Sequence, residues 1–185
     1  MGKKHPEIEE KQIQFIKDQH IYFVGSATAD SRINVSPKGM DSFRVLNKNR
    51  VVWLNVTGSG NETAAHMQRD SRMTIMFCSF DEQPKILRLY GQAKTIYPCD
   101  EAWHELYALF DPLPGARQLF DMHIDLVQTS CGFGVPLYNF IDDRKTLITW
   151  ANRKGADGVA DYWQERNRTS LDDEPIRFSS EESND

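Results

Sequence analysis

Residues 51–66 read Val-Val-Trp-Leu-Asn-Val-Thr-Gly-Ser-Gly-Asn-Glu-Thr-Ala-Ala-His. The first part is rich in β-branched and aromatic residues, and Arg50–Val56 is predicted as a strand. A glycine loop follows, and Asn61 is expected to be the N-cap of a short helix that runs through Gln68. Such a loop directs free backbone N–H groups of the helix at whatever lies before it, which is the arrangement that seats a phosphate.

The side chains of this loop add further hydrogen-bond donors. They are the hydroxyls of Thr57, Ser59 and Thr63 and the amide of Asn61. The same residues would equally suit a capped helix after a flexible loop, and their spacing matches neither a Walker loop nor a G-x-G-x-x-G fingerprint. The spacing alone therefore leaves phosphate binding and a simple capped helix both open.

Short strands are expected on both sides of this unit. The predicted strands are His20–Ala29, Arg32–Ser36, Ser42–Leu46, Arg72–Phe80, Lys85–Tyr97 with a bulge at Gly91, and Ile124–Thr129, with Leu137–Ile141 as a further candidate. The predicted helices are Glu7–Gln19, Asp100–Phe110 and Leu147–Arg166, the last split near Gly155 and Gly158. Strands joined mainly by short turns favour a mainly β fold, an antiparallel barrel of about six strands with peripheral helices.

The length of 185 residues suits one domain. Residues 1–178 are expected to form it, with a C-terminal helical extension, and the acidic residues 179–185 are expected to be a disordered tail. The net charge of −5 argues against nucleic acid as a partner. No apolar run approaches the roughly 20 residues of a membrane helix, and no secretory signal is visible, so a cytoplasmic location is expected.

The spacing of the cysteines and histidines does not predict a metal site. Cys78, Cys99 and Cys131 are widely spaced and form neither a metal-binding pair nor a disulfide framework, which fits a reducing compartment. The five histidines show no metal-ligand spacing. No metal is expected, and no catalytic residue can be assigned.

Lys38 is a candidate anion contact. It follows an alternating strand and Pro37, where regular strand pairing is expected to stop. A cation on such a rim would neutralise the phosphate of the glycine loop. Judged alone, Lys38 is better described as a solvated turn lysine.

Arg88 is a second candidate. On a strand, Ile86, Arg88 and Tyr90 share one face, and Leu87 and Leu89 share the other. An arginine in the middle of a strand is either a surface residue or an anion contact inside a cleft. The pattern leaves both interpretations open.

Four linked segments carry a resemblance to a known family. They are Asn34–Leu46, Val51–His66, Arg72–Phe77 and Ile86–Gly91. Their order resembles the pyridoxamine 5′-phosphate oxidase-like FMN-binding proteins, closest to an oxidase-related branch that also has a Gln-Thr-Ser-Cys-Gly-aromatic-Gly-Val-Pro segment like residues 128–136. The resemblance covers about residues 8–172. It implies a split β-barrel and a homodimer with two FMN molecules at the subunit interface.

The resemblance also implies site residues. Lys38 and the loop from Ser59 to Thr63 would contact the phosphate, and Trp53–Asn55 would run along the isoalloxazine. Arg88 would reach the flavin or its phosphate, while residues of the last strand would serve the partner subunit. The candidate cofactor-binding residues are Lys38, Trp53, Leu54, Asn55, Thr57, Ser59, Asn61, Thr63, Arg88, Gln128 and Ser130.

The departures from the family limit the function. The phosphate loop of the true oxidases carries basic residues, whereas Asn61-Glu62-Thr63 stands here, and their C-terminal arginine and histidine motif is not recognisable. Ser170–Pro175 also departs from the branch's usual pattern. We therefore expect an FMN-dependent oxidoreductase acting on an unidentified small molecule, with NAD(P)H as a candidate partner, rather than a pyridoxamine 5′-phosphate oxidase. The alternatives are a non-catalytic flavin sensor or carrier, or a relative that binds deazaflavin or haem.

Overall fold

The computed structural model describes residues 2–178, so the predicted tail at 179–185 lies outside the described residues. The strands are β1 (Lys3–His5), β2 (Tyr22–Ser26), β3 (Asn34–Lys38), β4 (Phe43–Asn47), β5 (Arg50–Val56), β6 (Arg72–Cys78), β7 (Ile86–Ile96) and β8 (Ala116–Ser130). The helices are α1 (Glu10–Lys17), α2 (Glu62–Met67), α3 (Trp103–Tyr107) and α4 (Thr146–Arg166).

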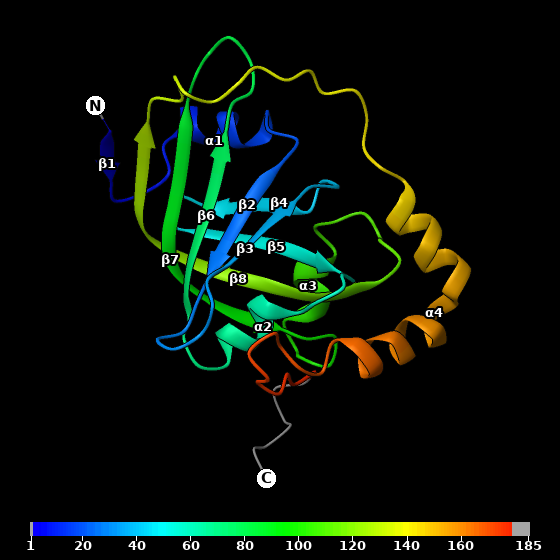
Figure 1. Ribbon diagram of the computed structural model, residues 1–185. Helices are drawn as coiled ribbons and strands as arrows, with labels where there is room; N and C mark the ends of the chain where they lie inside the picture. Colours follow the sequence, from blue (N-terminus) through cyan, green and yellow to red (C-terminus); the bar gives the residue numbers. More distant parts are fainter. Residues whose placement is uncertain (1, 179–185) are drawn as a thin grey trace.

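The strands form one antiparallel sheet in the order β3-β2-β6-β7-β8-β5-β4, with β1 paired to β8. The sheet curls around a core but does not close, so β3 and β4 are its ends (Figure 1). This is the predicted mainly β, antiparallel split-barrel class, with eight strands where about six were expected.

A bulge between β7 and β8 allows the sheet to curl. The register between the two strands shifts between Tyr90 and Gly91, as the sequence predicted. A Cβ atom at Gly91 would lie 1.9 Å from the carbonyl oxygen of His123, so only glycine permits this close approach. Before the bulge, residues 119–123 of β8 pair with β7 on one side and with β5 on the other, which links the two halves of the sheet.

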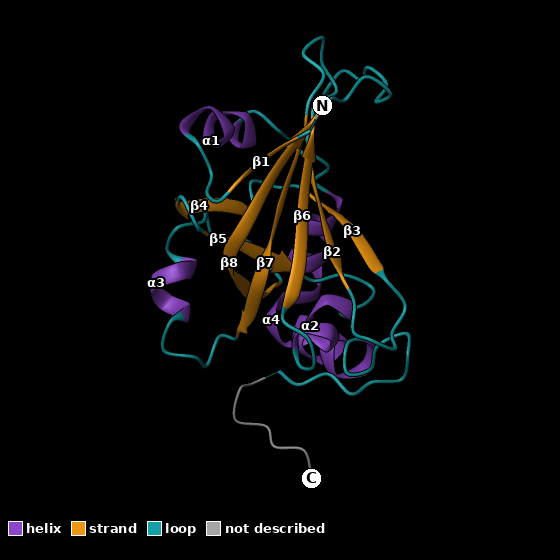
Figure 2. Ribbon diagram, turned by 90° about the vertical axis from the view of Figure 1, so that its left-hand side faces the viewer, coloured by secondary structure: helices purple, strands orange, loops and turns teal. Residues whose placement is uncertain are grey.

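β5 lies between two hydrophobic cores. Val51 and Trp53 face the interior of the curled sheet, which α1 covers at one end. Val52 and Leu54 face the opposite side, where α3 packs (Figure 2). Because β5 is buried on both faces, its sequence is a nearly continuous apolar run, and its predicted bounds match the observed ones.

Two strand predictions were wrong at the end of the sheet. β8 begins at Ala116 rather than at Ile124, because its first part contains the buried polar residues Arg117, Gln118 and Asp121, which obscure the expected alternation. Residues 137–141 form no strand and leave large apolar side chains exposed.

β3 corrects the expectation for Pro37. The strand continues through Pro37 to Lys38, which pairs with Tyr22 of β2. β3 is an edge strand, where a proline is tolerated because its missing N–H does not interrupt a second ladder. Lys38 is therefore held on a strand and not in a solvated turn.

After β8, the chain leaves the sheet, forms α4 and then returns to the sheet. α4 lies outside the sheet and contains the predicted break at Gly155, where φ is 71°, while Gly158 stays within the helix (Figure 1). The chain then runs beside α2 and buries Ile176 in the main core. In the part of the chain that the structure describes, we find no helix long and apolar enough to cross a membrane.

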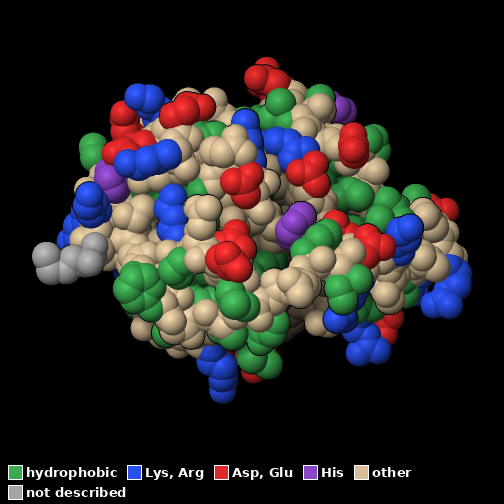
Figure 3. Space-filling view, turned by 90° about the horizontal axis from the view of Figure 1, so that it is seen from above, with side chains coloured by type: hydrophobic (Ala, Val, Ile, Leu, Met, Phe, Trp, Pro, Cys, Tyr) green, Lys and Arg blue, Asp and Glu red, His purple; other side chains and the backbone are tan. Residues whose placement is uncertain are grey.

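The face seen from above in Figure 3 carries basic and acidic side chains interspersed with one another. Its positive charges do not gather into a continuous surface of the kind that binds a nucleic-acid backbone.

Candidate functional site: an anion pocket beside an apolar groove

Strands β3, β5 and β8 and the glycine loop converge on a small hollow of about 260 Å³, which we call the anion pocket. Its lining residues are Asn34, Ser36, Lys38, Asn55, Gly58, Ser59, Gly60, Asn61, Glu62, Thr63 and Arg117. The structure thus brings together five of the residues that the sequence singled out: Lys38, Asn55, Ser59, Asn61 and Thr63.

Lys38 enters this pocket from β3. Its Nζ donates to Asn55 Oδ1 at 3.2 Å and lies 5.3 Å from the centre of the Trp53 ring. No carboxylate within residues 2–178 forms an ion pair with Lys38. Burial, with the positive charge of Arg117 nearby, lowers the pKa of the Lys38 amine to about 8.

Arg117 is the second cation, and the sequence analysis missed it. Its side chain is fully buried, with Nη1 donating to Asn167 Oδ1 at 2.5 Å and Nη2 donating to Gly60 O at 3.2 Å. Burial lowers its pKa to about 10. The missing signal was the early start of β8, because an arginine at an inward-facing strand position would have indicated a buried anion contact.

Several buried polar atoms of the pocket lack a partner. Within the described residues, six buried side-chain N or O atoms make no hydrogen bond, and three belong to pocket-lining residues: Ser36 Oγ, Asn61 Nδ2 and Arg117 Nε. Leaving such a group unpaired costs about 1–3 kcal/mol. Their concentration in one pocket, next to two cations, fits a ligand rich in acceptor oxygens.

The helix after the loop contributes less than predicted. α2 is short, and the Asn61 side chain does not cap it, because its Oδ1 accepts a hydrogen bond from Gln118 Nε2 at 2.6 Å. Thr57 lies behind the loop, where its hydroxyl donates to Gly115 O at 2.8 Å. The anion-binding character therefore comes from the two cations and the loop.

Trp53 and Leu54 do not line the pocket. Their side chains are buried in the two opposite cores and expose no surface to a ligand. The Trp53 ring stacks on Phe120 and lies under Lys38. Contact of these residues with a cofactor stays a prediction.

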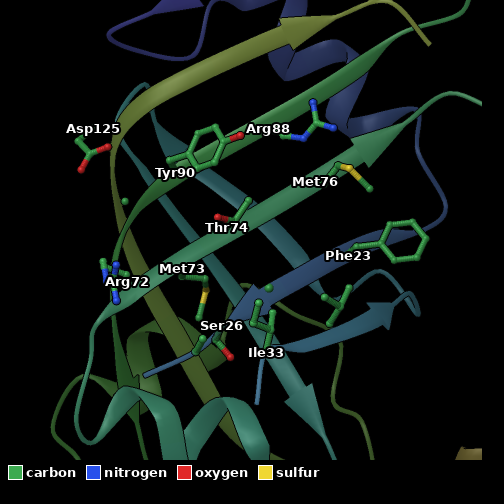
Figure 4. A pocket seen from close by; sticks show the side chains of 14 residues that line it. Phe23, Ser26, Ile33, Arg72, Met73, Thr74, Met76, Arg88, Tyr90 and Asp125 are labelled. Carbon is green, nitrogen blue, oxygen red and sulfur yellow. The ribbon is translucent and has the colours of Figure 1, made fainter. Parts of the chain in front are cut away.

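A larger groove lies on the outer face of β2, β3, β6 and β7, which we call the apolar groove (Figure 4). Its volume is about 670 Å³. Apolar side chains of Phe23, Ile33, Val35, Met73 and Met76 line much of it, together with the polar residues Ser26, Arg72, Thr74, Arg88, Tyr90 and Asp125.

Arg88 and Tyr90 project from β7 into this groove, on the face opposite to the buried Leu87 and Leu89. This confirms the predicted sharing of faces along the strand. Arg88 Nη1 donates to Ser130 Oγ at 3.2 Å. Tyr90 Oη donates to Gln128 Oε1 at 3.1 Å. Two polar pairs between β7 and β8 thus border the apolar groove.

Alternate residues of β3 face the two hollows. Asn34, Ser36 and Lys38 line the anion pocket, while Val35 lines the apolar groove. The edge strand therefore separates a polar, cationic site from a wider apolar one.

The fold is that of an open split-barrel protein, with a polar pocket that two cationic side chains line at the edge of its sheet. The sequence model of the family described as "Pyridoxamine 5′-phosphate oxidase" matches residues 8–131. The chain belongs to this family.

Three relatives illustrate the likeness. The pyridoxamine 5′-phosphate oxidase family protein ustO of Aspergillus flavus is 42% identical over 138 residues, which cover 69% of this chain and 53% of ustO. The chain therefore spans about half the length of that relative. A solved structure of a candidate pyridoxamine 5′-phosphate oxidase from Lactobacillus delbrueckii has a TM-score of 0.54 at 21% identity, covering 66% of this chain and 94% of that one.

The third relative is the haem storage protein HutZ of Vibrio cholerae. Its structure has a TM-score of 0.50 at 19% identity, covering 67% of this chain and 96% of that one. At these identities, both solved structures establish the shared fold alone.

Proposed function

We propose that this protein binds FMN, with the phosphate in the anion pocket and the ring system in the apolar groove, and that it is an FMN-dependent oxidoreductase. The observation that carries the proposal is a pair of cations, the half-buried Lys38 and the buried Arg117, which face one pocket without an ion-paired carboxylate among the described residues. Two cations forced together in a buried site are unfavourable unless an anion joins them.

A phosphate monoester fits this pocket in charge and in size. It carries close to two negative charges at neutral pH and three strong acceptor oxygens. The unpaired donors of Asn61 and Arg117 supply partners for such oxygens. Glu62 also lines the pocket, but its carboxylate accepts hydrogen bonds from Leu171 N at 3.1 and 3.2 Å. Glu62, the one acidic residue of the pocket lining, is therefore hydrogen-bonded to the C-terminal segment.

The groove supplies the second part of the proposed site. Its mainly apolar lining suits one face of a flat ring system, and Arg88 at its border is held by Ser130. Bound FMN would supply hydride transfer to or from a small organic substrate. Arg88 would then stabilise negative charge that develops on the reduced ring, because a fixed nearby cation favours the anionic form.

The role of Arg88 leads to the first prediction. Arg88→Met should lower the reduction potential of the bound flavin by about 30–60 mV, which corresponds to about 1.4–3 kcal/mol for a two-electron couple. The measurement is an anaerobic redox titration against reference dyes. Lys94→Met is the control, because Lys94 lies on the same strand with an exposed side chain. Equal potentials in the Arg88 variant and in the wild type would contradict this role.

The apolar groove also motivates a homodimer with a shared cofactor site. Ile33, just before β3, and Val35 of β3 are 78% and 64% exposed, so the border of the groove is uncovered in one chain. Such exposed apolar surface beside a ligand groove is typical of an interface. A second copy packed there would cover it and enclose the ring.

Val35→Glu tests the shared site. We expect this variant to be monomeric in sedimentation and to bind FMN at least tenfold more weakly, because a ligand held by two subunits binds only the assembled form. Leu109→Glu, at an exposed apolar position after α3, is the control and should remain dimeric. A wild-type monomer that binds FMN tightly at low micromolar concentration would refute the shared site.

The likeness to HutZ favours haem as the second candidate. Haem also carries anionic groups and would use the apolar groove, but none of the residues that line the two hollows is a histidine. Titration with haem separates the two proposals, because a Soret shift without any FMN binding would support the second one. A flavoprotein that NAD(P)H does not reduce would instead indicate a carrier or a sensor.

A further inference from the structure

The C-terminal end of α4 is hydrogen-bonded to the glycine loop. Trp163 Nε1 donates to Thr57 Oγ1 at 2.7 Å. Asn167, which follows the helix, donates from Nδ2 to Gly58 O at 3.2 Å and to Ser59 O at 3.4 Å. α4 is otherwise poorly packed, with only Ala151 and Val159 buried. Its firmest attachment is thus to the phosphate-binding loop that the proposed function invokes.

These contacts orient the peptide groups of the loop. Asn167 holds the carbonyl oxygens of Gly58 and Ser59, and Arg117 holds that of Gly60. No peptide bond within the described residues is cis, and in a planar trans peptide the N–H points away from the C=O. The N–H groups of Ser59, Gly60 and Asn61 therefore point away from the groups that bond the three carbonyl oxygens.

Asn167 also fixes the buried cation. Its Oδ1 accepts a hydrogen bond from Arg117 Nη1, while the same side chain donates to the loop. Asn167 is completely buried. A side-chain amide accepts from the guanidinium through its oxygen and, with the two N–H bonds of its nitrogen, donates to both carbonyls without adding a charge.

We propose that Asn167 is the positioning residue of the anion pocket, and that through it the last turn of α4 sets the affinity for the phosphate group. The proposal rests on the proposed function. It adds that phosphate binding and the attachment of α4 stabilise each other, since each depends on the same loop conformation.

The matched substitutions are Asn167→Asp and Asn152→Asp. Asn152 is an exposed residue of the same helix, so it receives the same chemical change without the contacts. Asn167→Asp should weaken FMN binding at least 30-fold, because the new carboxylate pairs with Arg117 and cannot donate to the loop. Riboflavin binding should change by less than threefold, and Asn152→Asp should alter neither affinity by more than twofold. Flavin fluorescence titration measures both.

A second variant, and a measurement on the wild-type protein, keep the test valid if the Asn167→Asp protein does not fold. Asn167→Ala removes the contacts without adding charge and should weaken FMN binding about fivefold to tenfold. In the wild-type protein, inorganic phosphate or FMN should slow the hydrogen exchange of residues 160–167 at least fivefold, and riboflavin should not.

The outcomes separate this inference from the proposed function. If the wild-type protein binds FMN no better than riboflavin, the proposed function fails. If it prefers FMN but the Asn167 variants keep that preference in full, Asn167 is not a positioning residue. Unchanged exchange of the last helical turn on phosphate binding would also overturn the inference, whatever the variants do.

Discussion

Replacing Lys38 with methionine should weaken FMN binding by about 100-fold and leave riboflavin binding within about threefold. A charge-assisted hydrogen bond to a buried phosphate contributes about 1.5–3 kcal/mol, and riboflavin lacks the phosphate. Methionine has a similar length, so the pocket would keep its shape. Calorimetric titration with the two flavins measures the difference directly.

The same substitution should stabilise the ligand-free protein. Burial lowers the pKa of Lys38 from 10.5 to about 8, so the folded state disfavours the charged amine that the unfolded chain retains. This penalty is fully present below pH 8 and disappears as the pH rises from 8 to 10.5. At pH 7 we expect Lys38→Met to raise the free energy of unfolding by about 1–3 kcal/mol.

A matched control is Lys94→Met, at an exposed side chain whose long contact with Asp121, at 3.7 Å, is secondary to the bidentate pair of Asp121 with Arg50. It should change the free energy of unfolding by less than about 0.5 kcal/mol. Weaker FMN binding combined with higher ligand-free stability is the signature of a binding residue held at a cost to the fold. Loss of both stability and binding would instead mark Lys38 as a structural residue.

FMN affinity should fall as the pH rises above 8. Below pH 8 the Lys38 amine is already charged in the free protein, so binding needs no proton. Above that pH, binding must first charge the amine, and the affinity falls about tenfold per pH unit until the pKa of the bound state is reached. Between pH 7.5 and 9.5 we expect a loss of about 20-fold.

Two comparisons show whether this loss of FMN affinity is caused by deprotonation of Lys38. The Lys38→Met protein and riboflavin binding to the wild type should both have nearly flat profiles over the same range. Calorimetry in buffers of different ionisation enthalpy should detect uptake of about one proton per FMN near pH 9. A flat FMN profile in the wild-type protein would contradict the lowered pKa or the contact.

Local patterns predicted the parts of the fold that depend on neighbouring residues. The bounds of β5 and the bulge at Gly91 both follow from side chains within a few positions. The start of β8 did not, because Arg117 and Gln118 are polar yet buried, and their partners are remote in the sequence. A polar residue that points inward resembles a loop residue until its partner is known.

In the candidate site, too, local sequence patterns indicated some residues and not others. Asn55 lies on a predicted strand and Lys38 just after another, and the structure brings them into one pocket with the glycine loop. Arg117 and Asn167 reach that loop across separations of 57 and 109 residues, and no local spacing relates them to it. Long-range pairing of β5 with β8 brings Arg117 there.

The position of Arg117 also bears on the way in which the phosphate loop departs from the family pattern. The phosphate loop reads Asn61-Glu62-Thr63, without the basic residues of the true oxidases, and the sequence therefore argued against a pyridoxamine 5′-phosphate oxidase. In the structure, Arg117 of β8 lines the same pocket and bonds to Gly60. The positive charge that the loop lacks is thus supplied from another strand.

The most direct test of phosphate-anchored flavin binding is a paired titration of the protein, purified without phosphate, with FMN and with riboflavin. We predict that FMN binds at least 100-fold more tightly than riboflavin and that inorganic phosphate competes with it. Equal affinity for the two flavins, or no binding of either, would contradict the assignment of the anion pocket.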